Sequence, residues 1–452
     1  MNLDLSKIKK VFFVGIGGIG ISALARMALS QGVMVSGLND EEGGKTLETL
    51  EQDGIKVVLK KDFKKLPDAD LYVYSDAWDF RGPEIINEAK KTGKPVLTYF
   101  EALGQFARGY KVIAIAGTHG KTTTTAMVAN ILIDAGFDPT CIIGSFVPTF
   151  GRGSATSRDK NGSNFRSGSS KYLVVEADEY NRHFLNFHPF ITVITNIEPD
   201  HLDYYKDIAD IRTAFGELIS QTSDTVIYNG GDSDISVLVH GYNGKTVDYS
   251  KYLDKVPRLS VPGEHNKINA AAALVVADAL GVALDVAQKS LAGFSGTWRR
   301  LEKKGETEEG TIVYDDYAHH PTEIKASLQA LRELYPKNKK NITILFQPHL
   351  YSRTKALFDD FAKSFSQADR ILLLPIYFAR EIKDENISSE KLAEAITEQG
   401  DNAQAFSSFE LAETFLKSLD WGSKDVFVTM GAGEAYKVAD KMFDLTNNKN
   451  IV

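Results

Sequence analysis

Residues 110–125, YKVIAIAGTHGKTTTT, constrain the fold of this chain more than any other segment. A short apolar run leads into a loop with Gly117 and Gly120, and Lys121 and four threonines follow. This order is typical of a nucleotide phosphate site, in which loop N–H groups and a helix N-terminus hold phosphate oxygens, a lysine adds a cation and a threonine hydroxyl binds Mg²⁺. The segment therefore predicts ATP and Mg²⁺ as ligands. The residues expected to hold the phosphates are Gly117, Thr118, His119, Gly120, Lys121, Thr122 and Thr123.

The loop is shorter than the common G-x-x-x-x-G-K-[ST] form, because only two residues separate its glycines. This shortness argues against an ordinary kinase or GTPase.

Composition limits the class of protein. With 452 residues, 43% of them hydrophobic and 25% charged, the chain has the composition of a globular protein with about three domains of ~150 residues. A formal charge of -8 argues against nucleic acid as a partner. The single cysteine, Cys141, allows no intramolecular disulfide and fits a reducing cytoplasm. The N-terminal segment lacks the apolar core of a signal peptide, and no apolar run approaches the ~20 residues of a membrane span. We expect a cytoplasmic monomer or homodimer without membrane insertion.

Short apolar runs alternate with helical stretches along the whole chain, which predicts parallel sheets with crossover helices. We expect domain boundaries just before the phosphate loop and near Gly296. Residues 151–171 are rich in Gly, Ser and Arg, so we expect a mobile loop there. The predicted strands cover residues 11–14, 33–36, 71–75, 111–116, 172–175, 191–195, 225–228, 342–346, 371–374 and 426–429.

A second glycine motif follows the first predicted strand. Gly15, Gly17 and Gly20 form G-x-G-x-x-G, and Asp40 follows at the interval of about 20 residues at which ribose hydroxyls are bound. The motif is compatible with NAD or with the diphosphate of a UDP-sugar, and also with a tight turn that binds no ligand. A dehydrogenase would leave the separate ATP site unexplained.

Carboxylates and an imidazole follow two predicted strands of the central region. Residues 174–179 read VVEADE, and residues 196–203 read NIEPDHLD. Ligands of open α/β sheets bind at the carboxyl ends of the strands, and hard oxygen ligands suit Mg²⁺. We therefore select Glu176 and His201, together with Thr122, as metal candidates.

The C-terminal region carries DDYAHHPTE at residues 315–323 and FQPHLYSRT at residues 346–354. The adjacent histidines have no spaced third ligand, so contacts to nucleotide and substrate are favoured over zinc. Arg299 and Arg300 follow Trp298 at the second expected boundary, where a guanidinium could reach phosphates.

These segments together resemble the Mur ligase family of bacterial cell-wall synthesis, and the branch that adds L-alanine to UDP-N-acetylmuramate is the most similar. Nine pieces carry the resemblance over nearly the whole chain, namely VGIGGIGISALA with SGLND, AIAGTHGKTTTTAMV, VVEADEY, TNIEPDHLDYY, VPGEHNKINAAAAL, FSGTWRRLE, DDYAHHPTEI, FQPHLYSRT and MGAGEAYKV. The resemblance implies an ATP-dependent amide ligase with three α/β domains. It implies a Rossmann-like UDP-substrate domain (1–107), a central P-loop ATPase-like parallel-sheet domain (108–296) and a Rossmann-like amino-acid domain (297–452).

The resemblance also implies roles for individual residues. Lys121, Glu176, His201, His319 and Arg353 would be catalytic. Nucleotide contacts beyond the loop would come from Asn196, His265, Asn269, Arg300 and Asp316. The substrates UDP-N-acetylmuramate and L-alanine would contact Gly15, Gly17, Gly18, Gly20, Asp40, Ser75, Asn164 and Arg166 of an N-x-R loop, His349 and Arg353.

Two departures from the family pattern bear on specificity. Leu350 stands where several relatives carry Arg, and residues 212–220 lack the lysine that is carbamoylated in sister ligases. Three alternatives stay open: a ligase that recycles an intact tripeptide onto UDP-N-acetylmuramate, an NAD-dependent oxidoreductase, and a non-catalytic regulator that binds ATP.

Overall fold

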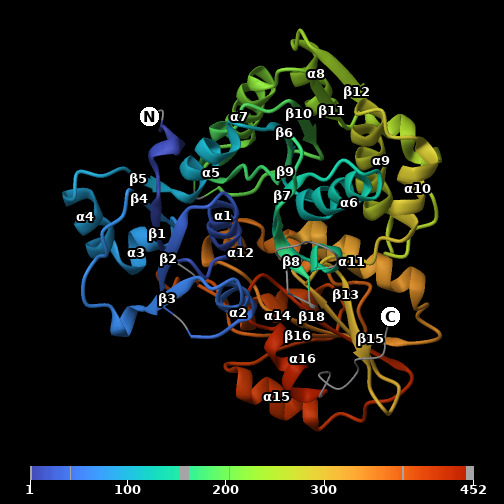
Figure 1. Cartoon of the computed structure of the whole chain (residues 1–452). Coiled ribbons are helices and arrows are strands. Elements are labelled where there is room, and N and C mark those ends of the chain that lie inside the picture. Colours follow the sequence, from blue (N-terminus) through green and yellow to red (C-terminus); the bar gives the residue numbers. More distant parts are fainter. Residues whose placement is uncertain (1–2, 41, 152–161, 203, 379–380, 444–452) are drawn as a thin grey trace. The chain divides into compact units, whose positions relative to one another are not determined.

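The computed structural model describes residues 3–40, 42–151, 162–202, 204–378 and 381–443. The chain forms two compact units. The first comprises Met1–Pro199, Tyr204–Ser260 and Lys267–Thr297, and the second comprises Asp200–Asp203, Val261–Asn266 and Trp298–Val452. The first unit holds two sheets and the second holds one (Figure 1).

The first sheet has five parallel strands in the order β3-β2-β1-β4-β5. The central strand β1 reads KVFFV and is buried after its first residue, as expected for a strand covered on both faces. Helix α1 is also buried on most sides, because it packs against β7 and β8 of the second sheet as well as against its own sheet. The elements of this part are η1 (Leu5–Lys7), β1 (Lys10–Val14), α1 (Ile19–Ser30), β2 (Met34–Asn39), α2 (Lys45–Gln52), β3 (Lys56–Leu59), η2 (Lys60–Asp62), β4 (Leu71–Tyr74), α3 (Trp78–Arg81), α4 (Pro83–Lys91), β5 (Val96–Thr98) and α5 (Tyr99–Ala107).

The second sheet has seven strands in the order β12-β11-β10-β6-β9-β7-β8. Strands β10, β6 and β9 are neighbours, so the loops that follow them meet at one edge of the sheet. This edge carries the phosphate loop and both acidic segments singled out in the sequence. The elements are β6 (Lys111–Ala116), α6 (Lys121–Asp134), β7 (Thr140–Val147), η3 (Pro148–Gly151), β8 (Ser163–Arg166), β9 (Tyr172–Glu176), η4 (Tyr180–Asn186), β10 (Ile191–Ile194), α7 (Ile208–Gln221), β11 (Thr225–Tyr228), α8 (Ser233–His240), β12 (Lys245–Asp248), η5 (Tyr249–Lys255), α9 (Glu264–Ala279) and α10 (Leu284–Ala292).

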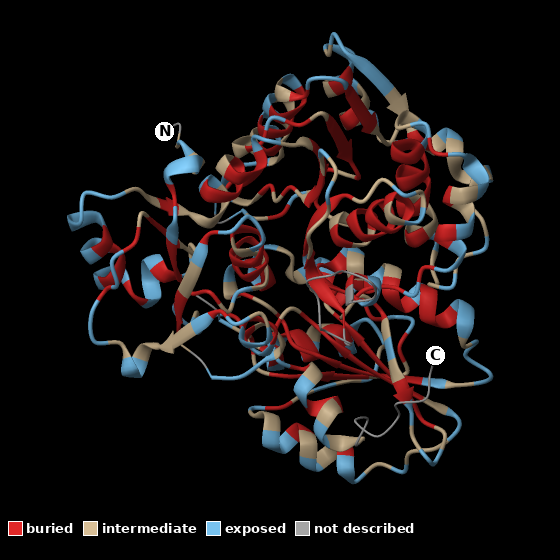
Figure 2. Ribbon diagram, viewed as in Figure 1, coloured by how far each residue is buried: buried red, intermediate tan, exposed pale blue. Residues whose placement is uncertain are grey.

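The third sheet has six strands in the order β13-β14-β18-β15-β16-β17. Alternate residues of β15 enter different cores, with Ile342, Ile344 and Phe346 on one face and Leu345 on the other. Figure 2 shows the resulting buried strands of this sheet. The elements are β13 (Glu302–Glu306), β14 (Ile312–Asp316), α11 (Pro321–Leu334), β15 (Asn341–Phe346), α12 (Tyr351–Ala356), α13 (Phe358–Ala362), β16 (Arg370–Leu373), α14 (Ser389–Glu398), β17 (Ala403–Ala405), α15 (Phe409–Lys417), β18 (Asp425–Met430) and α16 (Tyr436–Met442).

The predicted α/β class with three sheet-based parts is confirmed. The predicted parallel pairing is also observed, with β8 and β13 added antiparallel at sheet edges. One detail of the prediction is wrong. Residues 151–171 were expected to form a loop, but they contain strand β8, which has the sequence SNFR and pairs with β7. Residues 152–161 lie outside the described residues. The residue boundaries of the three domains stay a prediction.

Candidate active site

The phosphate loop between β6 and α6 has the backbone that its glycines allow. Gly117 and Gly120 have φ values of 135° and 82°, in the region that residues with a side chain rarely adopt. A Cβ at Gly120 would also lie 2.5 Å from Asn269 Oδ1, and one at Gly117 would lie 2.0 Å from Thr195 Oγ1. Glycine is therefore required at both positions. Asn269 lies beside the loop, and its contact to the nucleotide stays a prediction.

Asn196 fixes the shape of this loop. Its side chain accepts a hydrogen bond from the backbone N–H of His119 (2.8 Å) and donates one to the His119 carbonyl (3.0 Å), and its own carbonyl accepts the N–H of Thr118 (3.0 Å). The N–H groups of Thr118 and His119 thus hold the loop. The N–H groups that suit a phosphate are those of the first turn of α6, which have no partner within the helix.

Lys121 is the first residue of α6 and folds back over the loop. Its Nζ donates to the carbonyls of Gly117 (2.6 Å) and Thr118 (3.1 Å) and lies 2.7 Å from Glu179 Oε2. Burial lowers the pKa of Lys121, but the charges of Glu179 and Asp178 outweigh burial and raise this pKa above its usual value. The loop therefore holds a charged ammonium beside the helix N-terminus. Glu179 was not selected from the sequence, although it belongs to the acidic segment that drew attention to Glu176.

Thr122 and Glu176 meet at the end of β9. The threonine Oγ1 donates to Glu176 Oε1 at 2.6 Å, and the other carboxylate oxygen accepts the backbone N–H of Gly144 in β7. A hydroxyl and a carboxylate are the hard oxygen donors that Mg²⁺ prefers. The donor set therefore fits the expected metal.

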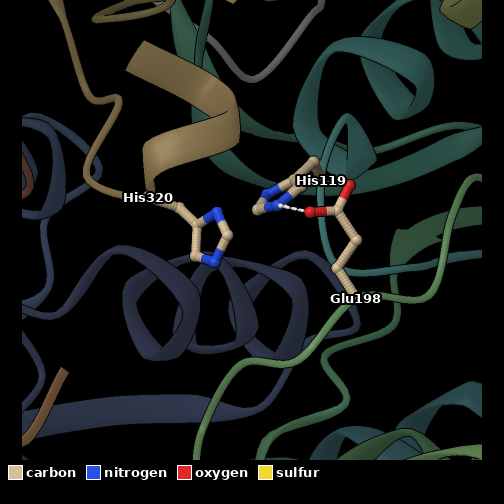
Figure 3. Close-up of side chains that lie close together, drawn as sticks. All are labelled: His119, Glu198 and His320. Atoms are coloured by element: carbon tan, nitrogen blue, oxygen red, sulfur yellow. Dashed lines mark ion pairs between the residues drawn. The ribbon is translucent and has the colours of Figure 1, made fainter. Parts of the chain in front are cut away.

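His119 and Glu198 form a second pair at the same sheet edge. His119 Nε2 lies 3.6 Å from Glu198 Oε2, and Figure 3 shows the two side chains turned toward each other. The Glu198 backbone N–H also donates to Thr118 Oγ1 at 2.9 Å, so the loop after β10 is tied to the phosphate loop. His320, also labelled in Figure 3, belongs to the second unit and caps the N-terminus of α11.

The glycines of the first motif lie in close packing. A Cβ at Gly15 would lie 2.2 Å from Trp78 Nε1, one at Gly17 would lie 2.7 Å from Asn39 Oδ1, and one at Gly20 would lie 2.8 Å from the Tyr99 ring. Close packing is therefore enough to explain why glycine stands at these three positions, whether or not a ligand binds there. Their role in substrate binding stays a prediction.

The other candidates of the first motif lie at the same edge of the first sheet. Gly18 precedes α1 as its N-cap residue, and Ser75 follows β4, where its N–H bonds the Val14 carbonyl at 3.1 Å. Asp40 follows β2 and pairs with Arg81 at 3.0 Å.

Asn164 and Arg166 lie in β8, so the expected N-x-R loop is a strand. Asn164 is buried and donates to the Ile19 carbonyl (2.6 Å) and to Ser22 Oγ (3.0 Å) of α1. Arg166 pairs with Asp138, and a Ser169 hydrogen bond and Arg166 lower the pKa of that carboxyl to about 2. Both residues thus have partners within the first unit.

In the second unit, Arg353 and Asp200 form a buried pair. Arg353 Nε and Nη2 donate to Asp200 Oδ1 at 3.1 and 2.8 Å, and Nη1 lies 3.3 Å from His349 Nδ1. Burial raises the pKa of Asp200, but the Arg353 charge holds it well below its usual range. His201 lies beside Asp200, with Nε2 3.9 Å from Oδ2 and a left-handed φ of 54°. Asp200 was missed as a site residue because nothing in the sequence connects positions 200 and 353.

His319 and His349 lie close together in this unit, with ring centroids 5.8 Å apart. Burial lowers the pKa of His319 to about 4, so its imidazole is neutral at pH 7. Its Nδ1 lies 3.0 Å from the Tyr317 carbonyl and 3.4 Å from Glu323 Oε2. These acceptors place the proton on Nδ1 and leave Nε2 as the basic atom.

Asp315 and Asp316 are the last residues of β14. Burial raises the pKa of Asp316 to about 6, and its carboxylate accepts a hydrogen bond from Ser327. His265 is a further candidate of this unit, and burial lowers its pKa.

The two arginines at 299 and 300 differ in their surroundings. Arg299 is buried and bonds Asp315 (2.8 Å) and the carbonyls of Gly431 (2.6 Å) and Gly433 (3.2 Å), so it stabilises the sheet. Arg300 is 29% exposed and has a looser ion pair to Glu323 (3.7 Å). Of the two guanidinium groups, that of Arg300 is the more available to a phosphate, and its contact to the nucleotide stays a prediction.

Three domain descriptions of one family match successive parts of the chain. The Mur ligase family catalytic domain matches residues 10–111, the Mur ligase middle domain matches 115–256, and the Mur ligase glutamate ligase domain matches 299–433. The UDP-N-acetylmuramate–L-alanine ligase of Clostridium novyi (strain NT) is 40% identical over 96% of this chain and 97% of its own length. The chain belongs to the Mur ligase family. The resemblance stated from the sequence is thus confirmed.

Solved structures of Mur ligases have the same fold. The UDP-N-acetylmuramate–alanine ligase of Thermotoga maritima matches with a TM-score of 0.77 and 27% identity, covering 98% of this chain and 100% of that one. A murein peptide ligase from Psychrobacter arcticus matches with a TM-score of 0.70 at 23% identity, over 98% of this chain and 100% of that one, which shows a shared fold. No helix in the described part of this Mur ligase has the length and apolar character of a membrane span.

Proposed function

We propose that this chain joins L-alanine to the carboxylate of UDP-N-acetylmuramate in an ATP-dependent reaction of peptidoglycan synthesis. The observation that carries the proposal is the phosphate loop with Lys121 at the start of α6 and the Thr122–Glu176 pair beside it, in a chain 40% identical to a relative named for this reaction. We assign the UDP-substrate domain to residues 1–107, the ATP domain to 108–296 and the amino-acid domain to 297–452.

The reaction requires activation of the carboxylate, because a carboxylate anion does not react with an amine in water. A carboxylate oxygen attacks the γ-phosphorus of ATP, the bond to ADP breaks, and an acyl phosphate forms. The amine of alanine then attacks the acyl carbon, phosphate leaves with the bonding electrons, and the nitrogen loses a proton. Negative charge accumulates on phosphate oxygens in the first step and on the acyl oxygen in the second.

The groups around the phosphate loop stabilise this charge. Lys121 supplies a cation that exchanges between Glu179 and the transferred phosphoryl group, and the N-terminus of α6 supplies N–H groups. Thr122 and Glu176 would hold Mg²⁺, with His201 as a further candidate ligand. Bound there, the ion would screen the triphosphate charge during transfer.

Side chains of the second unit would serve the acceptor. His319 Nε2 is unprotonated at pH 7 and suited to accept a hydrogen bond from the attacking amine. Arg353 and His349 would bind the alanine carboxylate, and Arg353 would share its guanidinium between that carboxylate and Asp200. Arg300, Asp316 and His265 of this unit, and Asn269 of the first unit, would contact the nucleotide. Exclusion of water would protect the acyl phosphate.

The alternatives carry less support. A recycling ligase for an intact tripeptide shares the fold, but Leu350 offers no cation for the extra carboxylates. In an oxidoreductase the first glycine motif would bind NAD, but its glycines are accounted for by packing against Trp78, Asn39 and Tyr99.

The test is release of phosphate from ATP in the presence of UDP-N-acetylmuramate and each of the twenty amino acids. L-alanine should give the highest rate. A change of nicotinamide absorbance would support the oxidoreductase instead, and ATP binding without phosphate release would support a regulator.

A further inference from the structure

His183 connects three segments of the first unit. Its Nε2 lies 2.7 Å from Asp76 Oδ2, and its Nδ1 lies 3.7 Å from Asp178 Oδ2. Its ring stacks on Phe100, with centroids 4.0 Å apart and planes at 15°. Asp76 follows β4 of the first sheet, Phe100 lies in the first turn of α5, and Asp178 follows β9 of the second sheet. The imidazole therefore joins the two sheets at one point.

We propose that His183 is a positioning residue for the ligation. It holds the loop after β4 of the first sheet at a fixed position relative to the carboxylates around Lys121 in the second sheet. The proposal rests on the proposed function, because it assigns UDP-N-acetylmuramate to the first sheet and ATP to the second. No role for His183 or Asp76 follows from the resemblance or from the sequence motifs.

The imidazole is charged where it lies. Burial lowers the pKa of His183, but the charges of Asp178 and Asp76 and the short contact to Asp76 outweigh burial and raise this pKa to about 9. The uncharged neighbours are Phe100, the Tyr180 ring with its centroid at 5.8 Å, and Asn181, whose Nδ2 lies 3.4 Å from Nε2. The two aspartates are thus the charged groups that face the ring.

Asp76 depends on this link. Within the described residues its other carboxylate oxygen, Oδ1, is buried without a hydrogen-bond partner. A half-buried carboxylate with an unsatisfied oxygen is held in place mainly by its remaining partner, here the His183 cation. Since Ser75, a candidate for substrate binding, precedes Asp76 directly, the position of that loop bears on the nucleotide sugar.

Asp178 connects the link to the phosphate loop. Its charge is among those that raise the pKa of Lys121, together with Glu179 and Glu176. Asp178 thus lies 3.7 Å from His183 Nδ1 and adds to the negative charge around Lys121. Through Asp178, the position of His183 bears on the surroundings of the cation in the second sheet.

The ligation reaction depends on the relative position of the first and second sheets. The carboxylate of a substrate bound at the first sheet must reach the γ-phosphate bound at the second, and a misplacement of about 1 Å can lower a rate by about 10²-fold. Loss of the link should therefore weaken productive use of UDP-N-acetylmuramate and leave ATP binding largely unchanged.

The kinetic test compares His183→Gln, Asp76→Asn and the double variant with wild type. His188→Gln is the matched control, because His188 is an exposed histidine five residues away. We expect each single variant to lower kcat/KM for UDP-N-acetylmuramate by about 10- to 100-fold, with the Kd of ATP changed less than about 3-fold. We expect the double variant to be no worse than the poorer single variant, because both changes break one link. Multiplying losses, or losses equal to that of His188→Gln, would overturn the proposal.

The second measurement needs no ligation. Imidazole ¹⁵N shifts of full-length protein, titrated between pH 6 and 10, should give a His183 pKa near 9 in wild type and a lower one in Asp76→Asn. A His183 that titrates near 6.5, as an isolated imidazole does, would contradict the link. If His183→Gln does not fold, Asp76→Asn still decides both measurements, since Asp76 is 30% exposed. Absence of ligation by wild type would contradict the proposed function and leave the titration result standing.

Discussion

Lys121 Nζ lies 2.7 Å from Glu179 Oε2, and the two side chains are only 17% and 3% exposed. A buried ammonium of this kind needs a partner carboxylate, because an unpaired buried charge is strongly destabilising. Glu179 therefore keeps Lys121 charged when no nucleotide is present. A phosphate that arrives at the loop competes with Glu179 for the same ammonium.

Lys121→Ala should abolish ligation, whereas UDP-substrate binding should persist because we assign the two nucleotides to different domains. The change also removes the cation that pairs with the buried Glu179 carboxylate, so the free energy of unfolding should fall. Contacts to charge in a transition state contribute about 3 kcal/mol or more, so kcat/KM should fall at least ~100-fold. Lys111→Ala is the control, since Lys111 lies at the other end of β6 with its Nζ over the Phe190 ring. Near wild-type turnover of Lys121→Ala in a phosphate-release assay would rule out the assignment.

Glu176→Gln should raise the Mg²⁺ concentration that gives half-maximal rate, because it removes a charged oxygen donor next to Thr122. His201→Ala should act in the same direction if His201 is a metal ligand. The measurement is a Mg²⁺ titration at saturating ATP and alanine, with Glu217→Gln as control because Glu217 pairs with Arg182 away from the loop. If only the dependence on alanine changed, both residues would belong to the acceptor site.

Because His183 is paired with Asp76, we expect the free energy of unfolding to decrease at alkaline pH. The folded-state pKa of about 9 lies above the usual value of 6.5, so the folded protein retains a proton that the unfolded chain releases between these values. The stabilisation is complete below pH 6.5 and is lost as pH rises through 9, by at most about 3 kcal/mol. Urea denaturation at pH 6.5 and 9.5 should show a smaller loss for His183→Gln than for wild type. His188→Gln should lose as much as wild type, and an equal loss in all three proteins would contradict the assigned pKa.

The phosphate loop could be predicted because its defining residues are close together in the sequence. Gly117, Gly120, Lys121 and Thr122 lie within six residues, and the backbone between them is set by the glycines and the start of α6. The strand ends that carry Glu176 and Asn196 were also predictable, because buried runs of Val and Ile end directly before them. Parallel pairing then brings these ends to one edge of the sheet.

Partners distant in the chain could not be predicted. Lys121 and Glu179 are 58 positions apart, and Arg353 and Asp200 are 153 apart, so no spacing rule connects them. Strand β8 was missed because its partner β7, and not its own composition, determines its conformation. The sequence also offered several carboxylates near Glu176, and only the fold distinguishes the one that faces Lys121.

The last prediction distinguishes alanine addition from tripeptide recycling. An acceptor with a methyl side chain needs a small pocket with one cation for its carboxylate, and the second unit offers Arg353 beside His349. A tripeptide would need further cations for its extra carboxylates, yet position 350 is a buried leucine. We expect rapid ADP formation with UDP-N-acetylmuramate and L-alanine, and weak rates with L-serine and glycine.

Arg353→Ala should chiefly raise the KM for alanine, because it removes the guanidinium that pairs with the acceptor carboxylate. It also removes the two hydrogen bonds that Arg353 donates to Asp200 Oδ1, so part of any loss of stability has that origin. Arg353→Lys separates the two effects, since it keeps a charge near Asp200 but loses the planar fork that binds a carboxylate at two points. A raised KM for alanine in a stable Arg353→Lys protein would support the acceptor role. Equal or better turnover of the wild type with L-Ala-γ-D-Glu-diaminopimelate would instead assign the chain to tripeptide recycling.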